Sequence, residues 1–243
     1  MTLLGGTSVP ARMGTLRDYY ESLLQDFGPQ GWWPAHTRLE VILGAILTQN
    51  TTWRNASLAL DQLRKHGLLR MENLRKVRRS EIERRIRQAG FYRQKAATIL
   101  SFIERLDRDY RGSLDDLFSI SPEEARRSLL EIKGLGPETV DAILLYAGRK
   151  PFFVADAYTR RILSRHGWLP VDATYESAQE LLHRQLPRDS HLFNEFHALL
   201  VEAGKRYCAR REPVCPGCPL HEYLAAAPQA GTPGEIPALP GMN

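Results

Sequence analysis

The stretch Lys133-Gly-Leu-Gly-Pro-Glu-Thr-Val140 decides how this chain of 243 residues is interpreted. One apolar helix is predicted before it, over residues 125–132, and a second one after it, over about 137–148. Gly134 and Gly136 have no side chains, so a tight turn between these helices leaves backbone N–H groups open to an approaching phosphate. The pattern predicts a helix-hairpin-helix that holds a nucleic-acid backbone without reading its sequence. An ordinary glycine turn between two packed helices would show the same pattern.

Helical periodicity extends along most of the chain, and no stretch of useful length alternates as a β-strand would. Glycine, proline or short polar joints separate the periodic segments. Ser121 followed by Pro122 is a helix-start pattern with the serine as the cap. We therefore predict an all-α protein. Further helices are expected over residues 15–27, 39–47, 53–69, 81–89, 94–106, 158–166, 175–186 and 192–207.

The chain is basic, with a formal net charge of +5 and a sequence pI of about 9.2. Its arginines cluster over residues 75–87 and 206–211, which favours a polyanionic partner, although solvated helix faces carry similar runs. No secretion signal opens the chain, and no segment approaches the length of a membrane span. The three cysteines all lie within residues 208–218, too few for a disulfide scaffold. A cytoplasmic location is expected.

A lone aspartate, Asp156, follows Glu138 by eighteen residues and stands where the helix over 158–166 should begin. A carboxylate at a helix N-terminus is kept ionised by the free N–H groups there. It can stabilise positive charge that builds on a sugar, and it can orient or deprotonate an attacking water. A plain helix N-cap would look the same in the sequence, and the two roles are compatible.

Ordered motifs give residues 39–218 a resemblance to the helix-hairpin-helix DNA glycosylases of the endonuclease III superfamily. The Trp32-Trp33-Pro34 element and the glutamate in the hairpin bring the chain closest to the 3-methyladenine DNA glycosylases of endonuclease III type. The matching pieces, in the order of the family, are Leu47-Thr-Gln-Asn-Thr51, Ala89-Gly-Phe-Tyr-Arg-Gln-Lys-Ala96, the hairpin, Asp156 and a cysteine group that starts at Cys208.

The resemblance implies a two-domain fold, in which a six-helix barrel packs against a second helical domain formed by both ends of the chain. The cleft between the two domains would hold the active site. The expected segments are a disordered tail over 1–12, the N-terminal helix of the second domain over 13–35, the barrel over 36–150 with its hairpin at 133–138, the rest of the second domain over 151–224 with a cysteine loop at 208–218, and a disordered tail over 225–243.

The activity implied by the resemblance is that of a base-excision repair enzyme. Such a DNA N-glycosylase binds double-stranded DNA, flips out a damaged base and hydrolyses its N-glycosidic bond. Alkylated purines such as 3-methyladenine are the expected substrates, Asp156 is the expected catalytic residue, and a monomer is expected. Family members that also cut the strand carry a lysine at the position of Glu138, whose amine forms a Schiff base. No lyase activity is therefore expected.

Two alternatives remain open at this point. One is an endonuclease III-like glycosylase and lyase for oxidised pyrimidines. The other is a DNA-binding helix-hairpin-helix protein that has no catalytic activity. The glutamate at position 138 speaks against the first alternative, and Asp156 at its expected place speaks against the second.

The base pocket implied by the resemblance is formed by Trp33, Trp53 and Glu138. Aromatic rings at the two tryptophan positions would sandwich the flipped base and restore the stacking that it loses outside the duplex. An alkylated purine often carries positive charge, so two aromatic faces and an anion favour it over a neutral base. Trp32, by contrast, is interpreted as a core residue.

Five further positions are implied as DNA contacts. Gln49 would fill the gap that the flipped base leaves, and Phe91 would act as an apolar wedge in the base stack. The hairpin residues Gly134, Leu135 and Gly136 would contact the phosphate backbone. Without the resemblance, Gln49 is a polar helix end and Phe91 an ordinary core aromatic.

The cysteine group reads Cys208-x6-Cys215-x2-Cys218, whereas the 4Fe–4S motif of the family adds a cysteine at the position of Leu224. Three thiolates suit an iron–sulfur cluster with a different fourth ligand, which is the first expectation. A zinc site closed by His221 is the second, and a loop without metal is the third. Any such site would stiffen a basic loop and take no part in redox catalysis.

Overall fold

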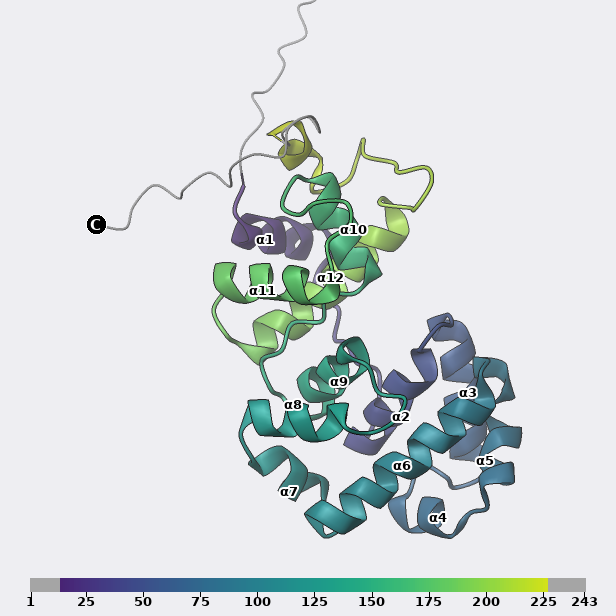
Figure 1. The fold of residues 1–243 in the computed structure, drawn as a ribbon. Coiled ribbons are helices and arrows are strands. Elements are labelled where there is room, and N and C mark those ends of the chain that lie inside the picture. Colours follow the sequence, from purple (N-terminus) through teal and green to yellow (C-terminus); the bar gives the residue numbers. More distant parts are fainter. Residues whose placement is uncertain (1–13, 227–243) are drawn as a thin grey trace, which may run out of the picture.

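The computed structural model describes residues 14–226, so the tail predicted over 1–12 and all but the first two residues of the tail predicted over 225–243 lie outside it. Residues 225 and 226 end a 3-10 helix, so the predicted tail begins too early. All regular elements in this range are helices, which confirms the all-α prediction (Figure 1), and none of them has the length and hydropathy to cross a membrane. The α-helices are α1 (Leu16–Phe27), α2 (Arg38–Thr48), α3 (Trp53–Lys65), α4 (Met71–Lys76), α5 (Arg79–Arg85), α6 (Tyr92–Tyr110), α7 (Leu114–Ser119), α8 (Pro122–Leu130), α9 (Pro137–Ala142), α10 (Ala157–Arg165), α11 (Tyr175–Gln185) and α12 (Ser190–Arg206). The 3-10 helices are η1 (Arg87–Ala89) and η3 (His221–Ala226), and the π-helix is η2 (Ile143–Ala147).

The helix starts follow the predicted capping chemistry. Ser121 caps α8, and its hydroxyl and the Glu124 carboxylate form a reciprocal capping box. Asp156 caps α10. The prediction missed α4 and α7, because helices of six residues are too short to show a clear 3.6-residue period. The helix expected over 81–89 is instead divided into α5 and η1.

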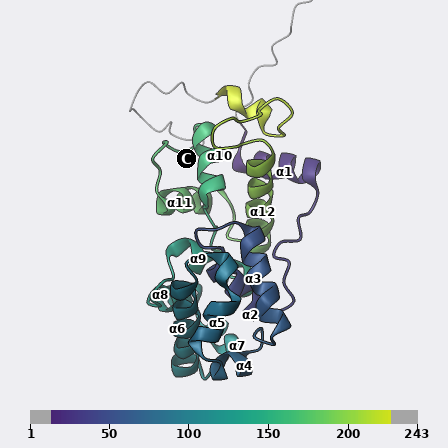
Figure 2. The same cartoon turned by 90° about the vertical axis from the view of Figure 1, so that its right-hand side faces the viewer.

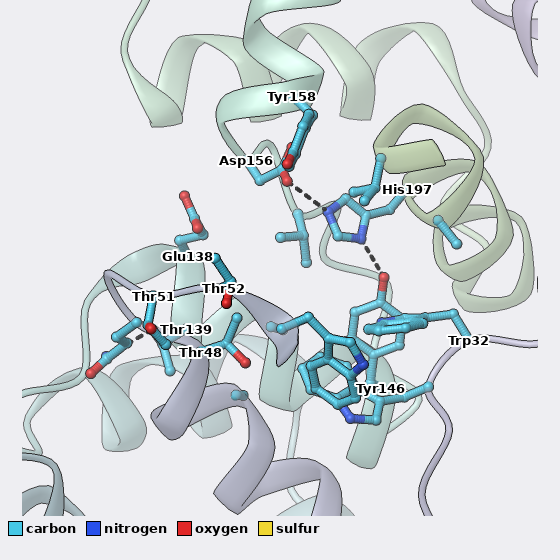
Figure 3. A pocket seen from close by; sticks show the side chains of 18 of the residues that line it. Trp32, Thr48, Thr51, Thr52, Glu138, Thr139, Tyr146, Asp156, Tyr158 and His197 are labelled. Carbon is cyan, nitrogen blue, oxygen red and sulfur yellow. Dashed lines mark hydrogen bonds and ion pairs between the residues drawn. The ribbon is translucent and has the colours of Figure 1, made fainter. Parts of the chain in front are cut away.

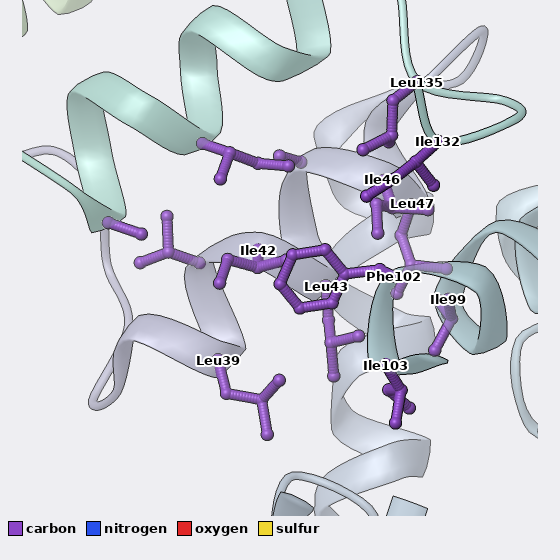
Figure 4. Close-up of a cluster of buried hydrophobic side chains, with 14 of the residues drawn as sticks. Leu39, Ile42, Leu43, Ile46, Leu47, Ile99, Phe102, Ile103, Ile132 and Leu135 are labelled. Carbon is purple, nitrogen blue, oxygen red and sulfur yellow. The ribbon is translucent and has the colours of Figure 1, made fainter. Parts of the chain in front are cut away.

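Two hydrophobic cores organise the described chain. The first surrounds α2, whose residues from Leu39 to Leu47 are all buried, and it includes side chains of α6 and of the hairpin (Figure 4). The second core unites α1 with α10, α11 and α12, although α1 is far from them in sequence. Both views of the fold show the two groups of helices stacked end to end (Figures 1 and 2).

The segment α9–η2 packs against both cores. Leu144 belongs to the first core and its neighbour Leu145 to the second, while Ala142 and Tyr146 contact both. We predicted one α-helix over about 137–148, but the helix widens to a π-helix from Ile143 onwards. Such wide turns are rare and occur frequently at functional sites. The segment therefore presents side chains to two cores and to the space between them.

A buried polar network also joins the two groups of helices. The Asp141 carboxylate of α9 is fully buried and accepts from Arg126 Nε of α8 at 2.7 Å. It also accepts from the Tyr175 hydroxyl at 2.8 Å and from Gln179 Nε2 at 2.7 Å, both on α11. A buried charge is tolerated when it is paired and hydrogen-bonded in this way. The network fixes the helix that follows the hairpin.

The two glycines of the hairpin have different physical roles. Gly134 has a φ of +96°, and a Cβ added to it would stand 2.1 Å from Thr98 Oγ1. Gly136 has an ordinary extended backbone, and a Cβ there would meet nothing within 4 Å. The fold therefore requires glycine at position 134. Nothing within residues 14–226 requires it at position 136.

Replacement of each glycine by alanine tests this difference. Gly134→Ala should lower the free energy of unfolding by about 2–3 kcal/mol, because positive φ and a side-chain clash both oppose the new methyl group. Gly136→Ala should change it by less than about 0.5 kcal/mol. Urea unfolding of the two variants measures both values. Equal losses at the two positions would contradict the geometry of the turn.

Candidate functional site

A pocket of about 630 Å³ lies between the two groups of helices. Its volume falls within the range of about 300–1,000 Å³ that is typical of small-molecule sites. Side chains from the segment before α2, the α2–α3 loop, α9, η2 and α12 line it (Figure 3). The structure brings together these predicted site residues: Trp33, Gln49, Trp53, Glu138 and Asp156.

Asp156 points into this pocket from the N-terminus of α10. Its Oδ1 accepts a hydrogen bond from the backbone N–H of Thr159 at 2.8 Å, so it is the helix cap. Its Oδ2 lies 3.7 Å from Nε2 of His197, and the side chain is 16% exposed. The cap therefore uses one carboxylate oxygen and leaves the other at the pocket. The two roles considered for this residue coexist geometrically.

The electrostatic surroundings of Asp156 keep it ionised. Burial alone would raise the pKa of its carboxyl group, but His197 and the N–H of Thr159 act in the opposite direction. The net result is a pKa below the ordinary value of an aspartate. An ionised carboxylate in a mostly buried wall can stabilise positive charge that develops on a neighbouring group.

Glu138 lines the same pocket from the first turn of α9, and it remains exposed at the rim. The pocket walls still remove part of the water around its carboxyl group, which raises the pKa of that group, and the charge of Asp156 raises it further, while Arg160 and His197 oppose the shift. The two carboxyl groups thus have pKa values displaced in opposite directions. Glu138, at which an anion was expected, is therefore the more easily protonated of the two carboxyl groups.

The tryptophans form a contact cluster instead of an open sandwich. The Trp33 and Trp53 rings meet edge to face, with centroids 5.2 Å apart and planes at 86°. Trp32 packs against Trp53 at 4.9 Å and also lines the pocket, so its interpretation as a core residue is wrong. No base fits between rings in edge-to-face contact. The rings close on one another because apolar faces gain free energy by leaving water.

The position of Trp33 is set by Gly44 of α2. A Cβ at residue 44 would stand 2.9 Å from the Trp33 ring, so only glycine leaves room for the indole. The buried Nε1 of Trp33 has no hydrogen-bond partner within the described chain. Trp33 also contacts Tyr146 edge to face at 5.3 Å. The ring therefore forms the inner wall of the pocket, next to η2.

Gln49 is bound to the hairpin. Its Nε2 donates to the Gly134 carbonyl at 2.9 Å and to Thr139 Oγ1 at 2.8 Å. These bonds hold the end of α2 against the turn and the start of α9. Insertion of Gln49 into a duplex, as the resemblance implies, would require both bonds to break.

Phe91 and Leu135 differ sharply in exposure. The Phe91 ring is 59% exposed, and its residue adopts a left-handed backbone (φ 44°) at the start of α6. Exposure of a large apolar ring agrees with the wedge expected there. Leu135 is only 6% exposed and packs in the first core near Ile46 (Figure 4). Its N–H donates to the Ile132 carbonyl, so neither its side chain nor its N–H is open to a phosphate in this conformation, and the DNA contact through Leu135 stays a prediction.

The arginine cluster over residues 75–87 is only partly neutralised within the protein. Four of its six arginines form ion pairs, with three carboxylates, whereas Arg78 and Arg87 form none with residues 14–226. At the pocket, Arg54 and Lys205 form no ion pair with any residue in 14–226. The pairs in the cluster are Arg75–Asp107, Arg79–Glu83, Arg84–Glu81 and Arg85–Glu81.

The three cysteines are free thiols that line one small cavity of about 30 Å³ with His221 and Leu224. Arg165 Nη1 donates to Cys208 Sγ at 3.1 Å. Burial raises the pKa of the Cys218 thiol, and Cys208 and Cys215 raise it further. Within residues 14–226 no group of three potential ligands is close enough to hold a metal ion. The cavity has room for about one or two water molecules only.

Sequence reasoning missed His197 and Tyr146, which meet at the pocket. Nδ1 of His197 is hydrogen-bonded to the Tyr146 hydroxyl, and its Nε2 faces Asp156 (Figure 3). A histidine within the apolar stretch of α12 was the available signal, since a buried polar group needs a partner. Tyr146 gave no signal, because its segment reads as an ordinary apolar helix.

Comparisons with known proteins show the family and the fold of this chain. A protein of Methanocaldococcus jannaschii, named as a candidate DNA repair glycosylase, is 39% identical over 206 residues, which cover 84% of this chain and 93% of the relative. The fold matches an endonuclease III trapped covalently on DNA, with a TM-score of 0.72, 21% identity and coverage of 84% and 92%.

A third similar protein is the 3-methyladenine DNA glycosylase of H. pylori bound to 1,N6-ethenoadenine, with a TM-score of 0.67 and 25% identity over 79% of this chain and 95% of that one. The family model described as "HhH-GPD superfamily base excision DNA repair protein" matches residues 43–188, which is more than half of the 243 residues. The chain therefore belongs to the HhH-GPD superfamily of base excision DNA repair proteins.

Proposed function

We propose that this protein is a monofunctional DNA glycosylase that releases alkylated purines such as 3-methyladenine from double-stranded DNA. The observation that carries the proposal is Asp156, an ionised carboxylate at the wall of a pocket that is lined by tryptophans. Cleavage of an N-glycosidic bond builds positive charge on the sugar, which such a carboxylate stabilises. The same carboxylate orients or deprotonates the water that attacks C1′.

DNA binding is proposed to involve the hairpin and Phe91. Open space around Gly136 allows a phosphate to approach the backbone closely, which explains a glycine that the fold itself does not need. The exposed Phe91 ring can enter the base stack at the site of flipping. Arg54 and Lys205, at the pocket, supply positive charge near the flipped nucleotide.

The proposed substrate class follows from the leaving group and from the pocket walls. An alkylated purine that already carries positive charge leaves without a proton from the enzyme. Tryptophan faces and carboxylates stabilise such a cation over the neutral parent base. Entry of the base requires Trp53 or Trp32 to turn away from its present edge-to-face contact.

The experiment measures base release from duplexes that contain 3-methyladenine, 7-methylguanine, hypoxanthine, uracil or thymine glycol. We expect release of methylated purines and an intact abasic strand. Asp156→Asn should lower the single-turnover rate by on the order of 100-fold or more, because it removes a charge that acts in the transition state. DNA affinity should change little, since it depends mainly on phosphate contacts.

A matched control separates catalysis from helix capping. Asp189 caps α12 and accepts from the N–H groups of His191 and Leu192, away from the pocket. Asp189→Asn makes the same chemical change at another cap and should leave the rate near that of the wild type. Release of thymine glycol but not of methylated purines would contradict the substrate class. Similar rates for the two aspartate variants would contradict the role of Asp156.

Absence of lyase activity is the second part of the proposal, because Glu138 supplies no amine for a Schiff base. Borohydride added during turnover should trap no covalent protein–DNA adduct. Glu138→Lys, which places an amine in the pocket wall, serves as the positive comparison. An adduct with the wild type that Lys205→Gln abolishes would show that Lys205 acts as the nucleophile, and the enzyme would then be bifunctional.

The cysteine loop is proposed to hold an iron–sulfur cluster on Cys208, Cys215 and Cys218. Three thiols around one cavity suit an iron–sulfur cluster chemically. The cavity of about 30 Å³ is too small for such a cluster, and Leu224 at the fourth position is not a ligand. Binding would require the loop to open, and no step of base release depends on it. The group would stiffen the loop, as iron–sulfur ligation by cysteine does elsewhere.

Metal analysis of the protein purified from cells tests this assignment. We expect about three to four iron atoms per chain with charge-transfer absorbance, as cysteine-bound clusters give, and loss of iron and of thermal stability in Cys215→Ser. Leu224→Cys should increase iron retention, since it restores the fourth thiolate. One zinc per chain, lost in His221→Ala, would support a Cys3His site instead. Absence of both metals with unchanged stability of Cys215→Ser would contradict any metal site.

A further inference from the structure

Three side chains from three separate elements form a continuous chain at the pocket. Tyr146 extends from η2, His197 from α12 and Asp156 from the start of α10. The Tyr146 hydroxyl is hydrogen-bonded to Nδ1 of His197, and Nε2 of the same ring lies 3.7 Å from Asp156 Oδ2 (Figure 3). The histidine side chain is only 10% exposed.

The groups at the two nitrogens of the His197 ring indicate which nitrogen carries the proton. The Tyr146 hydroxyl can donate to Nδ1 or accept from it, but the Asp156 carboxylate can only accept, so a proton on Nε2 and a donating tyrosine suit both neighbours. Nε2 has no hydrogen-bond partner at present within the described chain. Asp156 Oδ2 is the acceptor that it faces, and a movement of less than about 1 Å brings the pair to hydrogen-bond distance.

One hydrogen bond and one facing imidazole nitrogen act on different oxygens of the carboxylate. The Thr159 N–H fixes Oδ1 at 2.8 Å, and His197 faces Oδ2. Once Nε2 moves to hydrogen-bond distance, the carboxylate is held at both oxygens and has one orientation, which is what a group needs if it is to face a reacting atom. The backbone donor alone would leave Oδ2 without a directed partner.

We propose that His197, oriented by Tyr146, is a positioning residue that holds Asp156 in its ionised and productively oriented state. This inference rests on the proposed function, in which Asp156 is the catalytic carboxylate. His197 lies on α12 and Tyr146 on η2, so neither residue belongs to the hairpin motif or to the segment that begins α10.

Other charged groups act on the same cluster. Glu138 and Arg160 interact electrostatically with Asp156 or with the groups around it, from α9 and α10. Burial raises the pKa of the Tyr146 hydroxyl, and the charges of Asp156 and of Glu195, two residues before His197 on α12, raise it further. The tyrosine therefore stays protonated and remains a hydrogen-bond donor.

The test compares His197→Leu, His197→Gln and Tyr146→Phe with the wild type in single-turnover base release from DNA that contains 7-methylguanine, as a function of pH. The activity of the wild type should fall at acid pH as Asp156 becomes protonated. His197→Leu should lower the plateau rate about tenfold or more and move this acid limb up by about one pH unit, because the donor that favours the ionised carboxylate is gone. His197→Gln keeps an N–H donor and should restore most of the position of the acid limb.

A second Tyr–His pair provides the matched control. The Tyr19 hydroxyl is hydrogen-bonded to Nδ1 of His166 at 3.0 Å in the second core, with neither residue in the pocket. Tyr146→Phe should lower the rate about fivefold, the effect of one hydrogen bond. Tyr19→Phe removes the same kind of bond and should leave both rate and acid limb unchanged. DNA affinity should stay within about twofold of the wild type in all variants, since phosphate contacts set it.

The outcomes separate this inference from the proposed function. If the wild type releases no base, or if Asp156→Asn remains active, the proposed function is wrong. If the wild type releases the base and Asp156→Asn does not, but His197→Leu and Tyr146→Phe match the wild type in rate and acid limb, only the role of His197 is overturned.

Nitrogen NMR of the histidine rings gives a readout without turnover. It should show the proton of His197 on Nε2 in the wild type, and a proton on Nδ1 would overturn the inference even if His197→Leu does not fold.

Discussion

The packing of α9 and η2 between two hydrophobic cores is the constraint on which the site depends. Leu144 and Leu145 must enter different cores, and the π-helical turn allows neighbouring side chains to do so. The same turn places Tyr146 at the boundary, and Glu138 lies eight residues before it, in the first turn of α9. The bonds of Asp141 to Arg126 and to α11 fix this segment from the other side. The pocket is thus a consequence of the way in which two cores share one segment.

Burial and polar neighbours shift the pKa of Asp156 in opposite directions, and the neighbours have the larger effect. Removal of a carboxylate from water costs several kcal/mol even after relaxation. A hydrogen bond to a charged group returns about 1.5–3 kcal/mol, so one donor is insufficient and two become important. The Thr159 N–H already supplies one such bond, and His197 faces the other oxygen from 3.7 Å; together they hold the pKa of Asp156 below its ordinary value. Glu138 has no such donors, and its pKa is raised. One pocket therefore contains two carboxyl groups with different protonation behaviour.

Local patterns in the sequence predicted the parts of the fold that depend on local chemistry. The caps at Ser121 and Asp156, the buried helix after Leu39 and the glycine turn at 134–136 all appear in the structure. Contacts between distant elements could not be predicted from the sequence, because no local pattern shows that His197 of α12 meets Tyr146 of η2. The inward direction of Leu135 and the edge-to-face tryptophans were missed for the same reason. They depend on how the cores pack.

The most direct test of the central claim is a crystal structure of the wild-type protein on a duplex with 2′-fluorinated 7-methylguanine. The fluorine withdraws electron density from C1′ and opposes the positive charge of the transition state, so the bond stays intact while Asp156 is present. The account predicts the methylated base in the pocket, stacked on Trp32, Trp33 or Trp53, with C1′ next to Oδ2 of Asp156. A base that stays in the duplex, or a flipped base with Asp156 turned away from C1′, would contradict it.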